Sequence, residues 1–144
     1  MKALLVLALA SAFAAPPALA VPAAPVTKFK AAGFGYVLGR RDRQALYYWD
    51  VEKRAGGKIR CTGGCAALWP PLLVRSAAAV PKRVAGIRGT FGVIRRANGK
   101  LQVTHNGLPV YTYVHEGPGV TVVVSTFSQK FDPKDRIMVD AKKP

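Results

Sequence analysis

Two cysteines and two histidines are the side chains of this sequence that most readily carry redox or metal chemistry. Three residues separate Cys61 from Cys65, and Gly63-Gly64 among them permit a tight backbone path. In an oxidising compartment such a pair forms a local disulfide, which is the favoured interpretation, with no metal and no cofactor. The alternative is a soft-metal or redox site in which His105 joins the two thiolates as a ligand for Cu(I) or Zn(II).

Acid–base groups are scarce, since the chain holds only seven Asp and Glu residues. Glu52 and Glu116 could form a paired-carboxylate hydrolase site. Their symmetry-related positions favour structural roles instead, as acceptors for turn amides or as partners of arginine. His105 shares one strand face with Val103, where a histidine is usually packed and hydrogen-bonded, and His115 is expected to be exposed near a Gly-Pro-Gly turn. No catalytic residue is therefore predicted, and the chain is not expected to be an enzyme.

The elements that position these residues are predicted to be short β-strands separated by Gly, Asn and Pro. The predicted strands are Phe34–Leu38, Ala45–Trp49, Lys58–Cys61, Thr90–Arg95, Leu101–His105, Pro109–Val114, Val120–Thr126 and Arg136–Asp140. Asn98-Gly99 predicts a tight hairpin and Asn106-Gly107 a second turn. The only helical candidate is one turn at Cys65–Trp69, which Pro70-Pro71 would end. The fold class expected is mainly β, a small antiparallel domain.

The pattern Tyr-x-aromatic-x-x-Glu occurs twice, at Tyr47, Trp49 and Glu52 and again at Tyr111, Tyr113 and Glu116. We interpret this as two pseudo-repeats, about 33–74 and 90–140, within one domain over 33–140. Alternation along a strand places the two aromatic residues of each repeat on one face. Because half a domain buries too little surface alone, the two pairs are expected to meet in one core, with Glu52 and Glu116 at matching strand ends. An open aromatic face binding sugars or peptides is the less favoured interpretation.

Residues 1–20 predict a cleaved signal peptide. Lys2 precedes an apolar run, and Ala18 and Ala20 supply the small residues of a cleavage site before Val21. Residues 21–32 are rich in Pro and Ala and predict a flexible leader, and 141–144 form a tail. No later segment is apolar and long enough to span a membrane. The expected location is periplasmic or secreted, which agrees with a disulfide.

The chain is strongly basic, with 22 Lys and Arg against 7 Asp and Glu and a net charge of +15. The basic residues are scattered and form no nucleic-acid recognition motif, so nucleic acid is not the predicted partner. Outside the cytoplasm, anionic cell-envelope components such as lipid headgroups, lipopolysaccharide and wall polymers are the possible partners. A solvated positive surface is the simpler interpretation. The oligomeric state is left open.

Two segments carry a family resemblance: residues 61–72, CTGGCAALWPPL, and residues 96–111, RANGKLQVTHNGLPVY. With the repeats, they resemble the bacterial secreted-repeat or predicted lipoprotein family, whose motif is Tyr-x-(Phe/Trp/Tyr)-x-x-Asp and whose function is unknown. The matching residues are Tyr47, Trp49, Glu52, Trp69, Pro70, Pro71, Tyr111, Tyr113 and Glu116. The resemblance covers about 33–140.

This chain departs from that family's pattern. Both motif Asp positions are Glu, His105 replaces a usual Tyr, and Ile137-Met138-Val139 stand where a Trp is usual. The cysteine that anchors many members to lipid is absent at the cleavage point. The resemblance implies an exported, non-enzymatic envelope binding or structural module. The Cys-x3-Cys pair with a distant His also resembles the ligand set of periplasmic copper-delivery proteins, so a copper-binding or redox protein using Cys61, Cys65 and His105 is the alternative.

Overall fold

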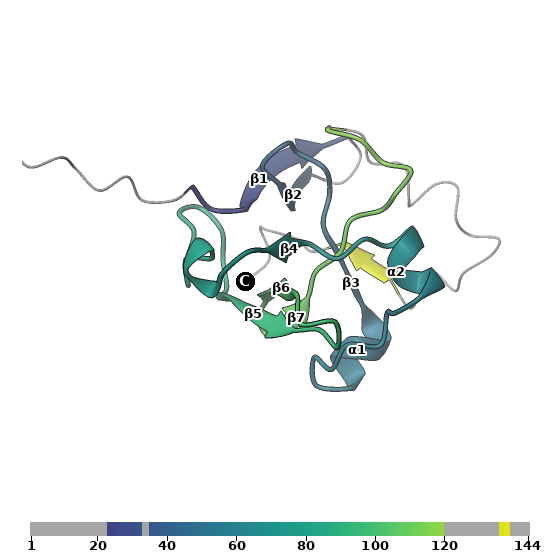
Figure 1. Ribbon diagram of the computed structural model, residues 1–144. Helices are drawn as coiled ribbons and strands as arrows, with labels where there is room; N and C mark the ends of the chain where they lie inside the picture. Colours follow the sequence, from purple (N-terminus) through teal and green to yellow (C-terminus); the bar gives the residue numbers. More distant parts are fainter. Residues whose placement is uncertain (1–22, 33–34, 120–135, 139–144) are drawn as a thin grey trace, which may run out of the picture.

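The computed structural model describes residues 23–32, 35–119 and 136–138 (Figure 1). This part of the chain is mainly β, as predicted. Its strands are β1 (Val26–Ala31), β2 (Gly35–Arg40), β3 (Tyr47–Trp49), β4 (Leu73–Val74), β5 (Phe91–Arg95), β6 (Leu101–His105), β7 (Leu108–Pro109) and β8 (Arg136–Met138). Two short helices, α1 (Asp50–Arg54) and α2 (Gly64–Leu68), and a 3-10 turn at Ala77–Ala79 complete it.

All pairings between these strands are antiparallel. β1 pairs with β2, β3 pairs with β8, and β6 lies between β4 and β5 with β7 also on it. The β5–β6 hairpin turns at Asn98-Gly99, and Gly99 has a φ of 79°. Asn106 and Gly107, with φ of 50° and 78°, join β6 to β7 in the left-handed geometry of a tight hairpin turn. Both turn predictions are confirmed.

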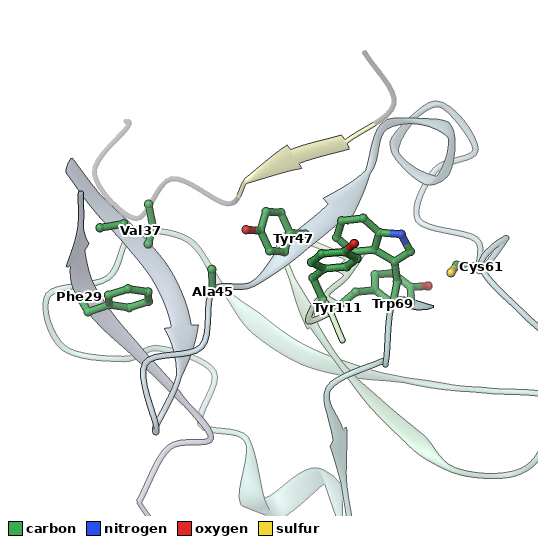
Figure 2. Close-up of a cluster of buried hydrophobic side chains, with 9 residues drawn as sticks. Phe29, Val37, Ala45, Tyr47, Cys61, Trp69 and Tyr111 are labelled. Atoms are coloured by element: carbon green, nitrogen blue, oxygen red, sulfur yellow. The ribbon is translucent and has the colours of Figure 1, made fainter. Parts of the chain in front are cut away.

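Buried side chains form two clusters on opposite sides of the central strands. Val37 belongs to the first cluster, while its neighbour Leu38 belongs to the second. Likewise, Tyr47 and Tyr111 belong to the first cluster, while their neighbours Leu46 and Val110 belong to the second. Because successive strand residues point to opposite faces, these segments are buried on both sides. Figure 2 shows the first cluster, which runs from β1 and β2 to the ring of Trp69.

One prediction near the start of the described chain is corrected. The flexible leader predicted over 21–32 is wrong for residues 26–31, which form β1. Val26, Phe29 and Ala31 are buried there and the two lysines are exposed. Val26 packs in the second cluster and Phe29 and Ala31 in the first, so this β-branched and aromatic segment forms a strand with residues buried on both faces despite the Pro and Ala around it.

The helix α1 was not predicted, because the only helical candidate was Cys65–Trp69, which corresponds to α2. In α1, Asp50 and Glu52 lie in the first turn and Lys53 and Arg54 in the last, as the helix dipole favours. Arg54 also forms an ion pair with Asp50 one turn away. Five residues are too few for a hydrophobic period to reveal such a helix in the sequence.

Several strand boundaries also differ. Lys58–Cys61 is not a strand, because the amides of Arg60 and Cys61 bind the carboxylate of Glu52 instead of a neighbouring strand. Pro109–Val114 is strand only at its start and continues as two isolated bridges at Tyr111, one to Tyr47 and one to Pro71. The signal peptide (1–20), Val120–Thr126, the end of Arg136–Asp140 and the tail (141–144) lie outside the described residues.

Candidate functional site

The aromatic residues of both repeats surround Trp69, whose side chain is buried. Its ring meets those of Tyr47 and Trp49 edge to face, each with centroids 5.4 Å apart, and that of Tyr113 at 4.8 Å. Tyr111 is buried in the same cluster. The prediction that the four repeat aromatics share one core is confirmed, and core packing rather than an open platform accounts for them.

The Trp-Pro-Pro segment runs beside Tyr111 and fixes its backbone. Pro71 forms a bridge with Tyr111, and the carbonyl of Pro70 accepts a hydrogen bond of 2.8 Å from the amide of Thr112. On the other side, Tyr111 exchanges two backbone hydrogen bonds of 2.8 Å with Tyr47. Proline is tolerated at both positions because these contacts do not require a hydrogen bond donated by its backbone nitrogen.

The two motif glutamates are paired reciprocally with the tyrosines of the opposite repeats. The Tyr47 hydroxyl donates to both carboxylate oxygens of Glu116, at 2.8 and 3.0 Å, and the Tyr111 hydroxyl donates to Glu52 Oε1 at 2.8 Å. Both glutamates are buried. The expectation of matching strand ends is wrong for Glu52, which lies in α1, while Glu116 lies in a segment without regular structure.

Burial and this reciprocal pairing both favour the neutral form of the two tyrosines. Burial first and the negative charge of Glu116 second raise the pKa of Tyr47 far above its ordinary value of 10.0. The pKa of Tyr111 is raised in the same way, by burial and then by its hydrogen bond to Glu52. Neutral hydroxyls donating to these buried carboxylates cross-link the two repeats.

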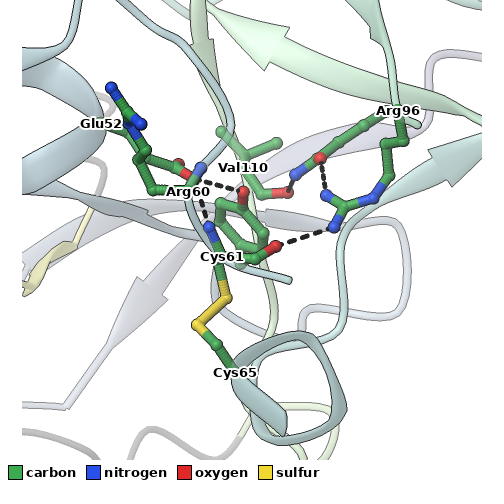
Figure 3. Close-up of a disulfide and its surroundings, with 8 residues drawn as sticks. Glu52, Arg60, Cys61, Cys65, Arg96 and Val110 are labelled. Atoms are coloured by element: carbon green, nitrogen blue, oxygen red, sulfur yellow. Dashed lines mark hydrogen bonds between the residues drawn. A yellow bond between two sulfur atoms is a disulfide. The ribbon is translucent and has the colours of Figure 1, made fainter. Parts of the chain in front are cut away.

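Glu52 also organises the segment that leads to the disulfide (Figure 3). Its Oε1 accepts the amides of Arg60 at 2.7 Å and Cys61 at 3.0 Å, which agrees with the predicted role of accepting turn amides. The sulfur atoms of Cys61 and Cys65 lie 1.99 Å apart, so these cysteines are paired with each other. Gly63, at the start of α2, has a φ of 55°, a conformation suited to glycine.

The same segment is tied to the β5–β6 hairpin by Arg96, which is buried. Its guanidinium donates to the carbonyl of Cys61 at 2.8 Å and to the side chain of Gln102. Gln102 in turn donates to the carbonyl of Val110 at 2.9 Å. Sequence reasoning missed the roles of Arg96 and Gln102. For Gln102, the available sequence signal was that a polar residue stands between apolar residues of β6.

His105 is not part of a ligand set with the cysteines. Its Nε2 lies 2.8 Å from the carbonyl of Arg88, and its ring packs on Phe91 with centroids 4.8 Å apart. Within the described residues, no three His, Cys, Asp or Glu side chains gather in a way that could hold a metal ion. The packed, hydrogen-bonded role predicted for His105 is confirmed, and His115 is exposed with its ring against Tyr113.

A hollow of about 660 Å³ lies between the disulfide loop and the β5–β6 hairpin, and we call it the basic hollow. Its cationic lining residues are Lys58, Arg95, Arg96 and Lys100. Thr62 and Ala66 line it from the disulfide segment, and Leu73 and Ile94 line it from the sheet. A second hollow, of about 530 Å³, shares Leu73, Arg95 and Lys100 with it and adds Arg75.

No carboxylate lines either hollow among the residues that the structure describes. Asp50 forms an ion pair with Arg54 within α1, and Asp42 forms one with Arg40 in a separate hollow beside Pro71. Glu52 and Glu116 are enclosed with the tyrosines. Among the described residues, Lys58, Arg95 and Lys100 therefore have no ion pair with a carboxylate, which makes the hollow attractive to anions.

Comparison of the chain with protein-family models, with curated proteins and with solved structures gives no match. The secreted-repeat family thus remains a resemblance carried by the motifs. In the described part of the chain, no helix is long and apolar enough to cross a membrane.

Proposed function

We propose that this chain is an exported, non-enzymatic module of the cell envelope, periplasmic or secreted, that binds an anionic envelope component in the basic hollow. The observation that carries the proposal is the lining of that hollow, where Lys58, Arg95, Arg96 and Lys100 meet without a carboxylate among the described residues. Phosphate and carboxylate groups are the anions of the envelope, and clustered lysine and arginine bind both.

A rigid frame supports a binding role. Hydrogen bonds to Cys61 and Gln102 hold Arg96 in place before any ligand binds. Ligand binding therefore costs little conformational entropy at this side chain. The disulfide loop forms the facing wall. A non-enzymatic role is supported by the enclosure of Glu52 and Glu116 and by the engagement of His105 with a backbone carbonyl, which leave these groups without a substrate to act on.

The test is a titration of isotope-labelled protein recovered from the periplasm with inositol hexakisphosphate, a compact soluble polyanion, followed by amide chemical shifts. We expect saturable shifts at Lys58, Thr62 and Lys100, which surround the basic hollow. Lys100→Glu should weaken binding at least about fivefold. Lys53→Glu, at an exposed lysine of α1, is the matched control and should bind as wild type does.

Shifts spread evenly over all exposed lysines, or equal loss in both variants, would contradict a defined site. Intact mass of the same sample tests export: the expected N-terminus is Val21, and a chain still beginning at Met1 would contradict the predicted cleavage.

A further inference from the structure

Leu73 is one of the large apolar side chains left exposed on the described surface, at 39%. It lines the basic hollow, the second hollow and a third of about 390 Å³ beside Pro71. Its place in the sheet explains this exposure, because β4 is an edge strand and Leu73 is paired on one side with Gln102. The strand pairing holds this leucine outward, at the point where three hollows meet. Leaving its apolar surface in contact with water costs free energy.

Exposed cations surround this leucine. Lys58, Arg75, Arg95 and Lys100 are all exposed and share the two adjoining hollows with it. Arg95 donates to the carbonyl of Gly99, which holds it at the hairpin end of the sheet. No ion pair joins any of these four to a carboxylate in the ranges that the structure describes. On the side of these two hollows, the described charged residues that border the leucine are all cations, whereas the third hollow holds the paired Arg40 and Asp42.

The rest of the lining indicates which anion fits. Aliphatic residues such as Ile59, Ile94 and Leu101 form the apolar part of the two hollows, and no aromatic ring contributes to either. Sugar rings and nucleobases are commonly bound by stacking on aromatic side chains, which this surface lacks. Aliphatic side chains ringed by lysine and arginine match the boundary between acyl chains and anionic headgroups.

We infer that this end of the molecule, Leu73 with Lys58, Arg75, Arg95 and Lys100, docks on the surface of an anionic phospholipid bilayer. This inference rests on the proposed function and names the envelope component that the basic hollow contacts. Leu73 enters the headgroup–acyl boundary, and the four cations contact lipid phosphates around it. Each cation near the surface adds affinity, and the leucine adds an apolar contribution that salt does not screen.

The experiment is sedimentation of the periplasmic protein with vesicles of phosphatidylglycerol and phosphatidylcholine, and with vesicles of phosphatidylcholine alone. Wild type is expected to bind only the anionic vesicles, more weakly at high salt. Leu73→Ser should reduce the partition coefficient about fivefold. Leu73→Phe should retain binding, and Val51→Ser, at an equally exposed apolar residue of α1, should leave it unchanged.

The outcomes separate the inference from the proposed function. If Leu73→Ser binds anionic vesicles as wild type does while Lys100→Glu does not, docking through Leu73 is wrong and anion binding stands. If wild type ignores vesicles but inositol hexakisphosphate still shifts the amides around the hollow, the ligand is a soluble or polymeric anion. If neither probe binds, both proposals fail. Circular dichroism and urea midpoints verify that each variant is folded.

Discussion

Replacing Tyr111 by phenylalanine removes one buried hydroxyl and keeps the ring that packs around Trp69. The hydroxyl donates to Glu52 Oε1 at 2.8 Å, and both side chains are fully buried. A hydrogen bond to a charged, buried acceptor contributes about 1.5–3 kcal/mol. Since small domains have a total stability of about 5–15 kcal/mol, Tyr111→Phe should cost a measurable fraction of it. Tyr111→Ala also removes the ring and should cost about 3–5 kcal/mol or more.

The assay is urea unfolding followed by circular dichroism, on wild type, Tyr111→Phe, Glu52→Gln and the double variant. Because the hydroxyl and the carboxylate are in direct contact, the two single losses should not add, and the coupling free energy should be about 1 kcal/mol or more. Tyr36→Phe, which removes the hydroxyl of a tyrosine that is 39% exposed, is the control and should change stability by less than about 0.5 kcal/mol.

Two results would refute this reasoning. One is a Tyr111→Phe protein with the urea midpoint of wild type, which would mean that the buried hydrogen bond contributes nothing. The other is strict additivity with Glu52→Gln, which would mean that the loss arises elsewhere. Either would also remove the physical basis for treating the two repeats as cross-linked by their tyrosines and glutamates.

The remaining predictions concern pH and the disulfide. Burial and the glutamates raise the pKa of Tyr47 and Tyr111 above 10.0, so the contribution of these tyrosines to folding stability is complete below pH 10. Above pH 10 the tyrosines ionise only in the unfolded chain. The free energy of unfolding should therefore fall by about 1.4 kcal/mol per pH unit for each tyrosine. Urea midpoints above pH 10 should therefore drop less steeply in Tyr111→Phe, and equal slopes would contradict this. Reducing Cys61–Cys65 should cost about 2 kcal/mol, because the loop it closes is short. A thermal melt with and without dithiothreitol measures this, and unchanged melting would contradict it.

The features that could be predicted from the sequence depend on local geometry. Asn98-Gly99 and Asn106-Gly107 predict their turns because few other residues accept a positive φ. Alternation along a strand places Trp49 on the same face as Tyr47, and the second copy of the motif predicts the same arrangement for the equivalent residues of the other repeat. The disulfide follows from two cysteines close in sequence with glycines between them. For the turns, the strand alternation and the disulfide, the physical cause lies in neighbouring residues.

What could not be predicted depends on contacts between distant residues. Lys58–Cys61 has the composition of a strand, yet its amides bind a carboxylate from α1, and no local pattern signals that partner. Arg96 stands in a turn-like Arg-x-Asn-Gly stretch typical of an exposed hairpin, but the tertiary fold buries it against Cys61. The basic hollow is invisible in sequence for the same reason, because Lys58 and Lys100 are separated by the disulfide segment and two strands.

The two repeats are alike in their tyrosine–glutamate pairs and unlike in what those pairs support. At the Glu116 end, the glutamate backbone carbonyl accepts from the side chain of Gln44. At the Glu52 end, the carboxylate holds the amide of Cys61, whose carbonyl holds Arg96 in the wall of the basic hollow. A continuous chain of hydrogen bonds thus runs from the core to the hollow at the Glu52 end. Losing Glu52 should therefore disturb anion binding as well as stability, and the inositol hexakisphosphate titration and the urea midpoint of Glu52→Gln measure the two effects.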